Sequence, residues 1–252
     1  MAIFKTEAVV LKTHDFRETS KIVSVYSRKY GRLQLIAKGV RNRKSKFGTV
    51  LDTLNYLSIV YYFKDTRELQ LLSNAELVKP FFNFRTDLKR FAYASIVAEI
   101  IYRTQLMGDE NPRLFHALIS VLDGIDGAAD FRNYFNAFLI RFLEISGFRP
   151  GLRRCMNCRR IPEDNWVYFD FNRGGYLCEK CHNTGNANFR FSLIALKSLQ
   201  VLRDSPWEEI EQINISENYL AEIEKFLLFY LKVHFDGLAT LHAVDFLRSL
   251  NL

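Results

Sequence analysis

The chain has 252 residues, of which 48% are hydrophobic and 14% aromatic, a composition typical of a globular protein with room for two domains. Residues 1–7 carry charges where a secretory signal needs an apolar run, and no stretch reaches the roughly eighteen apolar residues of a membrane helix. We therefore expect a cytoplasmic protein rather than a secreted or membrane-spanning one.

The formal net charge of +7 is unevenly divided along the chain. Residues 1–50 carry twelve Lys and Arg against three carboxylates, and the net charge of residues 1–80 is +8. Residues 81–252 carry twenty basic and twenty-one acidic side chains, a net charge of −1. This asymmetry indicates a polyanion-binding domain joined to a nearly neutral one.

Residues 1–80 contain five short runs that are apolar or alternate between apolar and polar residues, and most are rich in β-branched or aromatic side chains. Turn residues separate the runs, which predict strands at 8–11, 22–26, 32–36, 54–63 and 69–72. Five short strands favour an OB-fold barrel over residues 1–80, because that fold is a small five-stranded barrel that binds oligonucleotides.

A basic loop is predicted between the third and fourth strands. Residues 38–46 hold five Lys and Arg and no carboxylate, without apolar periodicity. Such cations can follow a phosphate backbone and release its counterions, although the loop could also be merely solvated. Because the charge is one-sided, we predict nucleic-acid contacts from this loop and the preceding hairpin. The predicted contact residues are Arg28, Lys29, Arg32, Lys38, Arg41, Arg43, Lys44 and Lys46.

Beyond Pro80 the apolar residues recur every three to four positions, which predicts a helical domain over residues 81–252. Ser192 and Ser216 stand where helix N-caps are expected. The predicted helices span 88–106, 112–122, 131–145, 193–202, 217–235 and 241–250. The fold class is therefore α+β, with an insertion at about 150–189 that interrupts the helices.

That insertion holds all four cysteines of the chain as two Cys-x-x-Cys pairs, with a strand-like run and a turn between them. The spacing predicts one structural Zn²⁺ ion bound by Cys155, Cys158, Cys178 and Cys181 in a zinc-ribbon-like loop. Two disulfides or a redox dithiol are the alternatives. His182 could replace one thiolate, although it fits better as a bystander.

Nothing in the sequence indicates an active site. Four thiolates would leave no open position on a metal ion, so the predicted zinc site is structural. The histidines have no partner in a recognisable catalytic spacing, and there is no Gly-rich phosphate loop. We expect no enzymatic activity and no nucleotide cofactor.

Several short segments, in this order, resemble the bacterial recombination mediator family RecO. They are 9–11 (Val-Val-Leu), 18–21 (Glu-Thr-Ser-Lys), 30–31 (Tyr-Gly), 37–41 (Ala-Lys-Gly-Val-Arg) and 44–46 (Lys-Ser-Lys), followed by a helical domain with four cysteines. The resemblance spans the chain and implies an N-terminal OB-fold and a zinc-bearing helical domain. Only some members of that family have the metal site, and here all four positions are filled.

The resemblance also implies a function in DNA repair and recombination, in the cytoplasm at the nucleoid. It implies binding of single- and double-stranded DNA, strand annealing, and work with RecR to load recombinase onto gaps covered by single-strand DNA-binding protein. The helical domain would then dock the acidic, apolar C-terminal tail of that protein. For this role we predict Arg132 and Arg141, which lie on the helix expected at 131–145.

Two other classes of function remain. A zinc-ribbon transcription or RNA-binding protein would place its basic surface around the metal, where Arg153, Arg154, Arg159 and Arg160 lie. A hydrolase or deaminase would need an open metal position or a nucleophile with a base, and neither is found.

Overall fold

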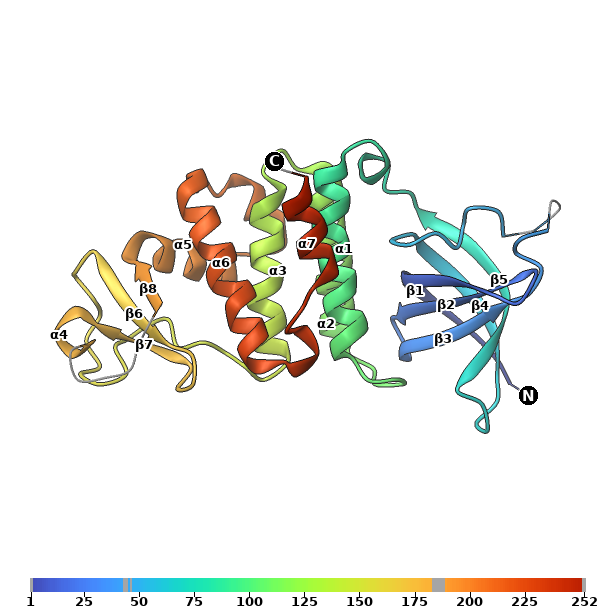
Figure 1. Cartoon of the computed structure of the whole chain (residues 1–252), viewed down its shortest axis with the longest axis horizontal. Coiled ribbons are helices and arrows are strands. Elements are labelled where there is room, and N and C mark those ends of the chain that lie inside the picture. Colours follow the sequence, from blue (N-terminus) through green and yellow to red (C-terminus); the bar gives the residue numbers. More distant parts are fainter. Residues whose placement is uncertain (1, 43–44, 46, 183–188, 251–252) are drawn as a thin grey trace. The chain divides into compact units, whose positions relative to one another are not determined.

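The N-terminal strands close into a barrel in the computed structural model, which describes residues 2–42, 45, 47–182 and 189–250 (Figure 1). The barrel order is β1-β2-β3-β5-β4, and β4 pairs with β1 to close the ring. The β3–β5 pairing is parallel and the others are antiparallel. The strands are β1 Ala2–Phe16, β2 Ser20–Ser27, β3 Gly31–Ala37, β4 Tyr56–Phe63 and β5 Leu69–Lys79.

β1 is longer than the sequence pattern predicted, because it has two partners. Its first half pairs with β4, its second half pairs with β2, and a bulge lies between Val10 and Lys12. Phe4, Thr6 and Ala8 alternate with exposed or half-buried charged residues, so the strand pattern extends to the N-terminus. β5 is likewise longer than the predicted 69–72.

Alternate side chains of the strands fill the barrel with aliphatic and aromatic groups. The connection between β3 and β4 contributes three of them, Val40, Phe47 and Leu51, and the last two are almost completely buried in the same core. The segment after the basic loop is therefore anchored to the barrel.

The chain divides into two compact units, Met1–His116 with Leu241–Leu252, and Ala117–Thr240. The first unit joins the barrel to α1 (Leu88–Thr104) and α7 (His242–Ser249), which pack side by side (Figure 1). Glu99 of α1 accepts hydrogen bonds from the backbone N–H groups of His242 and Ala243. This contact fixes the start of α7 on α1.

The outer surface of the β2–β3 hairpin is covered within the first unit. The ring of Phe115 lies 6.4 Å from that of Tyr26, whose pKa is raised by burial and by Asp109. Gly31 has φ +56°, and a Cβ there would lie 2.0 Å from the carbonyl oxygen of Asp109. Only glycine therefore fits this turn against the segment that follows α1.

The second unit packs α3 (Phe131–Ile145) against α5 (Leu193–Asp204) and α6 (Glu217–His234). The bounds of α3 are those that the sequence predicted. Ser192 caps α5 by accepting a hydrogen bond from the N–H of Ala195, whereas Ser216 holds the N-cap position of α6 without such a bond.

The remaining helical elements of the described chain are η1 Asn83–Arg85, α2 Pro112–Gly127, α4 Glu179–His182, η2 Trp207–Gln212 and η3 Asp236–Leu238.

A small antiparallel sheet in the second unit carries the cysteine segment. Its order is β7-β6-β8, with β6 Trp166–Asp170, β7 Gly175–Cys178 and β8 Phe189–Ser192. Phe169 and Phe191 of the sheet each lie 4.7 Å from the ring of Phe226 on α6. The sheet is therefore packed on the helices, and the predicted fold class is confirmed.

No helix in the described part of the chain is long and apolar enough to cross a membrane.

Candidate metal centre and nucleic-acid interface

The four cysteine sulfurs converge on one point of the small sheet. All four lie within 4.8 Å of one another, and the Sγ atoms of Cys158 and Cys178 are 3.7 Å apart. Four sulfurs around a zinc ion at about 2.3 Å would be separated by about 3.8 Å, whereas a disulfide needs about 2.05 Å. The cysteines are unbridged. The cluster therefore fits a metal ion such as zinc, and it does not form the alternative disulfides.

Backbone hydrogen bonds hold the two Cys-x-x-Cys turns in place. The N–H of Cys155 donates to the carbonyl of Arg160, and the N–H of Met156 donates to that of Tyr176 on β7. Arg159 has φ +60°, which reverses the chain just after Cys158. The second pair begins at the end of β7 and continues into α4, so the sheet register brings the pairs together.

The environment of Cys155 favours its thiolate. Burial acts to raise the pKa of this thiol, but hydrogen bonds from the backbone N–H groups of Cys178, Cys158 and Asn157 lower it to about 6. His182 is not part of the cluster, and its ring stacks on Tyr168 at 3.7 Å. If zinc is bound there, it joins the two turns and opens no position for catalysis.

The predicted DNA-contact residues that the structure describes lie at two ends of β3. Lys38 and Arg41 follow the strand and are exposed, and Arg41 pairs weakly with Asp15 at 3.6 Å. Arg43, Lys44 and Lys46 lie outside the described residues. Arg28 and Lys29 precede the strand, about 20 Å away along its length. The structure therefore places Arg28 and Lys29 apart from Lys38 and Arg41, and these described residues do not form one cluster.

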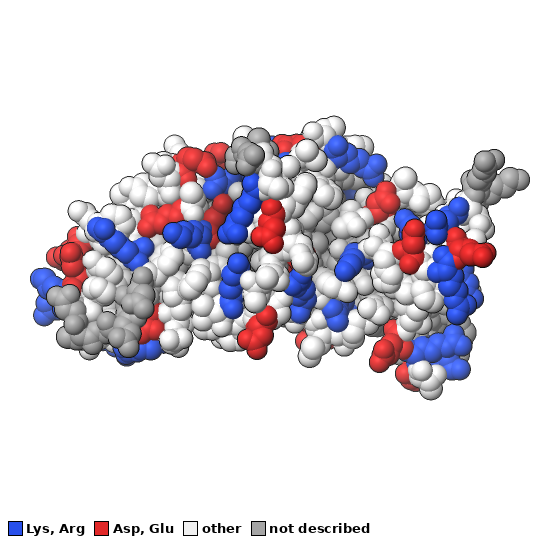
Figure 2. Space-filling model, in the orientation of Figure 1, with Lys and Arg blue, Asp and Glu red and all other residues white. Residues whose placement is uncertain are grey.

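Two of the hairpin arginines have partners within the first unit. Arg28 pairs with Glu7 at 2.9 Å and lies over the ring of Phe115. Arg32 donates a hydrogen bond to the carbonyl of Tyr102 and lies over the ring of that residue. Lys29 is exposed. In Figure 2, Lys and Arg side chains gather over the barrel with carboxylates among them.

Arg132 and Arg141 are engaged inside the helical unit. The side chain of Arg132 is 11% exposed and forms a two-pronged pair with Glu224 of α6, at 2.7 and 2.9 Å. Arg141 donates hydrogen bonds to the carbonyls of Leu202 and Ser205, and it lies 4.1 Å from the ring centroid of Trp207. Burial lowers the pKa of Arg141. These contacts connect helices, and the predicted docking role of both residues stays a prediction.

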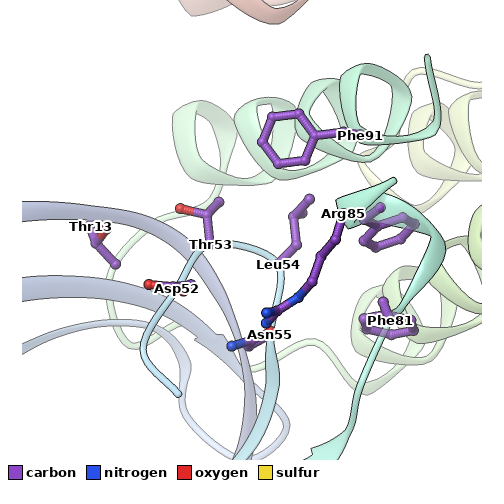
Figure 3. Close-up of a pocket in the computed structure, with 9 residues that line it drawn as sticks. Thr13, Asp52, Thr53, Leu54, Asn55, Phe81, Arg85 and Phe91 are labelled. Carbon is purple, nitrogen blue, oxygen red and sulfur yellow. The ribbon is translucent and has the colours of Figure 1, made fainter. Parts of the chain in front are cut away.

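A pocket of about 490 Å³ that was not predicted lies within the first unit (Figure 3). It is lined by polar residues of β1 and the β3–β4 connection and by aromatic residues that follow β5. The lining segments are far apart in the chain, so no local spacing could have identified the pocket. The one signal was the run of aromatic and basic residues at 81–91.

A barrel of the OB type, together with a helical unit that holds a four-cysteine cluster, defines the class of this protein. The family model described as Recombination protein O N terminal matches residues 1–81, and the one described as Recombination protein O C terminal matches residues 85–240. The chain belongs to the recombination protein O (RecO) family, as the resemblance in its short segments indicated.

Proteins similar along nearly their whole length include three that are each named DNA repair protein RecO. The protein from Alkaliphilus metalliredigens is 27% identical over 235 residues, which are 93% of this chain and 94% of the relative. The proteins from Caldanaerobacter subterraneus and Chloroherpeton thalassium are 28% and 29% identical, covering 94% and 98% of this chain and 94% and 99% of the relatives.

Proposed function

We propose that this protein is a DNA-binding mediator of recombinational gap repair. It binds single- and double-stranded DNA, anneals complementary strands, and acts with RecR and single-strand DNA-binding protein to load recombinase. The observation that carries the proposal is an OB-type barrel with a net charge of +8 over residues 1–80. The names of the similar proteins, all DNA repair protein RecO, support the same function.

The connection between β3 and β4 is the leading DNA contact in this proposal. Lys38 and Arg41 are exposed on it, while Phe47 and Leu51 fix its far end to the barrel core. Arg28 and Arg32 already bind groups of the first unit, so they contribute less to a phosphate contact than Lys29 does. Cations on an anchored loop can follow a phosphate backbone and retain the adaptability that sequence-independent binding needs.

The proposal includes protein partners. The helical unit, with a net charge near zero, would bind the C-terminal tail of single-strand DNA-binding protein. Arg132 and Arg141 are the predicted contacts, although each is now seen to have partners within its own unit. RecR is proposed to contribute to recombinase loading. The zinc site would stabilise the second unit and take no part in chemistry.

The proposal is tested by neutralising the loop and measuring DNA binding at graded salt. Replacing Arg41, Arg43, Lys44 and Lys46 by Gln should weaken binding similarly for all DNA sequences. The plot of log K against log salt should become less steep by about 0.7–0.9 for each lost phosphate contact. Unchanged affinity together with an unchanged slope would contradict this assignment.

A matched variant tests the alternative function, that of a zinc-ribbon transcription or RNA-binding protein. Arg153, Arg154, Arg159 and Arg160 are all exposed beside the first cysteine pair, as a zinc-ribbon transcription or RNA-binding protein would require. Replacing these four by Gln removes the same charge from the second unit. We expect a smaller loss of DNA affinity than the loop variant shows, and no preference of the wild-type protein for RNA. A larger loss of DNA affinity than in the loop variant, together with a preference of the wild-type protein for RNA, would favour the zinc-ribbon transcription or RNA-binding function.

A further inference from the structure

The pocket of the first unit holds an arginine that is not neutralised. Arg85 is exposed at the end of η1, and it extends toward Asn55 (Figure 3). Within the described ranges, no carboxylate pairs with its guanidinium and no acceptor receives a hydrogen bond from it. Asp52 lines the same pocket without forming an ion pair with Arg85. An unpaired guanidinium in a pocket suits an anionic group such as a phosphate.

Hydrogen-bonding groups on the opposite wall are held in fixed positions. Asn55 donates from Nδ2 to the carbonyls of Thr49 and Val50, both at 3.0 Å, so its Oδ1 remains as an acceptor. The loop that carries Asn55 is bound to β1 by two backbone hydrogen bonds. The N–H of Leu54 donates to the carbonyl of Val10 at 2.8 Å, and the N–H of Val10 donates to the carbonyl of Asn55 at 3.0 Å. Leu54 is held at φ +73°. The acceptors of this wall are therefore preorganised.

Aromatic rings form the remaining wall. The half-buried Phe91 lines the pocket and is supported edge-on by Phe246, with centroids 6.5 Å apart. Phe81 and Phe84 also line it and stack on each other at 5.1 Å. A volume of about 490 Å³ falls in the range of small-ligand sites. The pocket thus combines a stacking surface, fixed acceptors and one cation.

We propose that this pocket binds one unpaired nucleotide of single-stranded DNA. The base lies against Phe91, an N–H of the base donates to Asn55 or Asp52, and the adjoining phosphate binds Arg85. This inference rests on the proposed function and adds a site for a single base to it. Arg41 of the basic loop pairs with Asp15, which lies on the same face of β1 as the pocket residue Thr13.

The charges of the pocket favour a nucleotide over an acidic peptide. Asp52 would repel a run of carboxylates, whereas it accepts a hydrogen bond from a base N–H. Base stacking on an aromatic ring also tolerates any sequence, which matches a protein that binds gaps of arbitrary sequence.

The experiment compares two oligonucleotides of equal length, one of deoxythymidine and one with abasic sites throughout. Binding to the full-length wild-type protein is compared with binding to Phe91→Leu, Arg85→Ala and the control Arg248→Ala. Phe91→Leu keeps an apolar contact with Phe246, and Arg248 is an exposed arginine on α7. Thermal unfolding of each variant verifies that it is folded.

We expect the wild-type protein to bind deoxythymidine more tightly than the abasic strand. Phe91→Leu should weaken deoxythymidine binding about 5-fold or more and leave abasic binding unchanged. Arg85→Ala should weaken binding of both strands, and Arg248→Ala should leave binding of both strands unchanged. Equal effects of Phe91→Leu on both strands, or no effect, would overturn the pocket and leave DNA binding intact. Binding of neither strand by the wild-type protein would overturn the pocket and the proposed function together.

Discussion

Arg132 shows how the surroundings of a residue change its interpretation. It lies on α3 with a side chain only 11% exposed, and Glu224 of α6, with a side chain 14% exposed, receives two of its hydrogen bonds. Glu217 adds a third carboxylate contact. The sequence suggested a surface arginine that could receive an acidic peptide, whereas the structure joins two helices through it.

We predict that Arg132→Ala destabilises the protein by about 3 kcal/mol, because it leaves Glu224 largely buried without its charge partner. The measurement is urea-induced unfolding. Glu217→Gln is the matched control, since the side chain of Glu217 is 76% exposed, and it should change stability by less than about 1 kcal/mol. If Arg132→Ala is as stable as the wild-type protein but no longer binds the tail peptide of single-strand DNA-binding protein, this arginine instead contacts that partner.

His234 makes the stability of the second unit depend on pH. Burial lowers the pKa of this imidazole, and a hydrogen bond to the backbone of Phe171 has a smaller, opposite effect. The imidazole ring lies 4.3 Å from the ring of Tyr230. The unfolded chain therefore binds more protons than the folded chain near the ordinary histidine pKa of about 6.5. The contribution of His234 to stability is present above that pH and is lost as the pH falls below it.

His234→Gln should therefore reduce the loss of stability on acidification. The free energy of unfolding is measured on either side of about pH 6.5 in the wild-type protein, in this variant and in His14→Gln, an exposed control. The control should keep the pH dependence of the wild-type protein. An unchanged dependence in His234→Gln would show that this imidazole does not contribute.

At the scale of elements, the cysteine turns depend on the register of the small sheet. Cys178 pairs with Val167 in the β6–β7 ladder, and its N–H donates to the sulfur of Cys155 at 3.4 Å. A bound metal would join this ladder to the Cys155 turn. Metal binding and folding of the segment are therefore coupled.

We predict that the protein binds one zinc ion and that Cys178→Ser releases it and lowers the stability of the second unit by several kcal/mol. Elemental analysis and thermal unfolding give the two measurements. His182→Ala should keep the metal, because His182 stacks on Tyr168 outside the cluster. The absence of zinc from wild-type protein purified without chelator would disprove the prediction.

Periodicity predicted the elements better than it predicted their contacts. The apolar pattern of α3 has the right bounds, and the paired cysteines converge as their spacing indicated, because both signals are local. Arg32 looked like a hairpin cation, yet it binds the carbonyl of Tyr102, seventy residues away. β8 was missed because its four residues directly precede a helix. Contacts between distant segments have no local pattern that could reveal them.

At the scale of the whole molecule, charge divides the chain as the proposed function requires. The basic barrel would bind the DNA backbone, and the nearly neutral remainder would be left for protein partners. A simple DNA-binding protein needs only the basic barrel. The distinction between binder and mediator therefore depends on DNA that another protein already covers.

The most direct measurement is the rate at which complementary strands anneal when single-strand DNA-binding protein coats them. We predict that the wild-type protein accelerates annealing of coated strands, and that the variant with Gln at 41, 43, 44 and 46 loses this acceleration because it no longer holds the backbone. If the protein binds and anneals bare strands but leaves the rate for coated strands unchanged, it is a DNA-binding protein and the mediator function is contradicted.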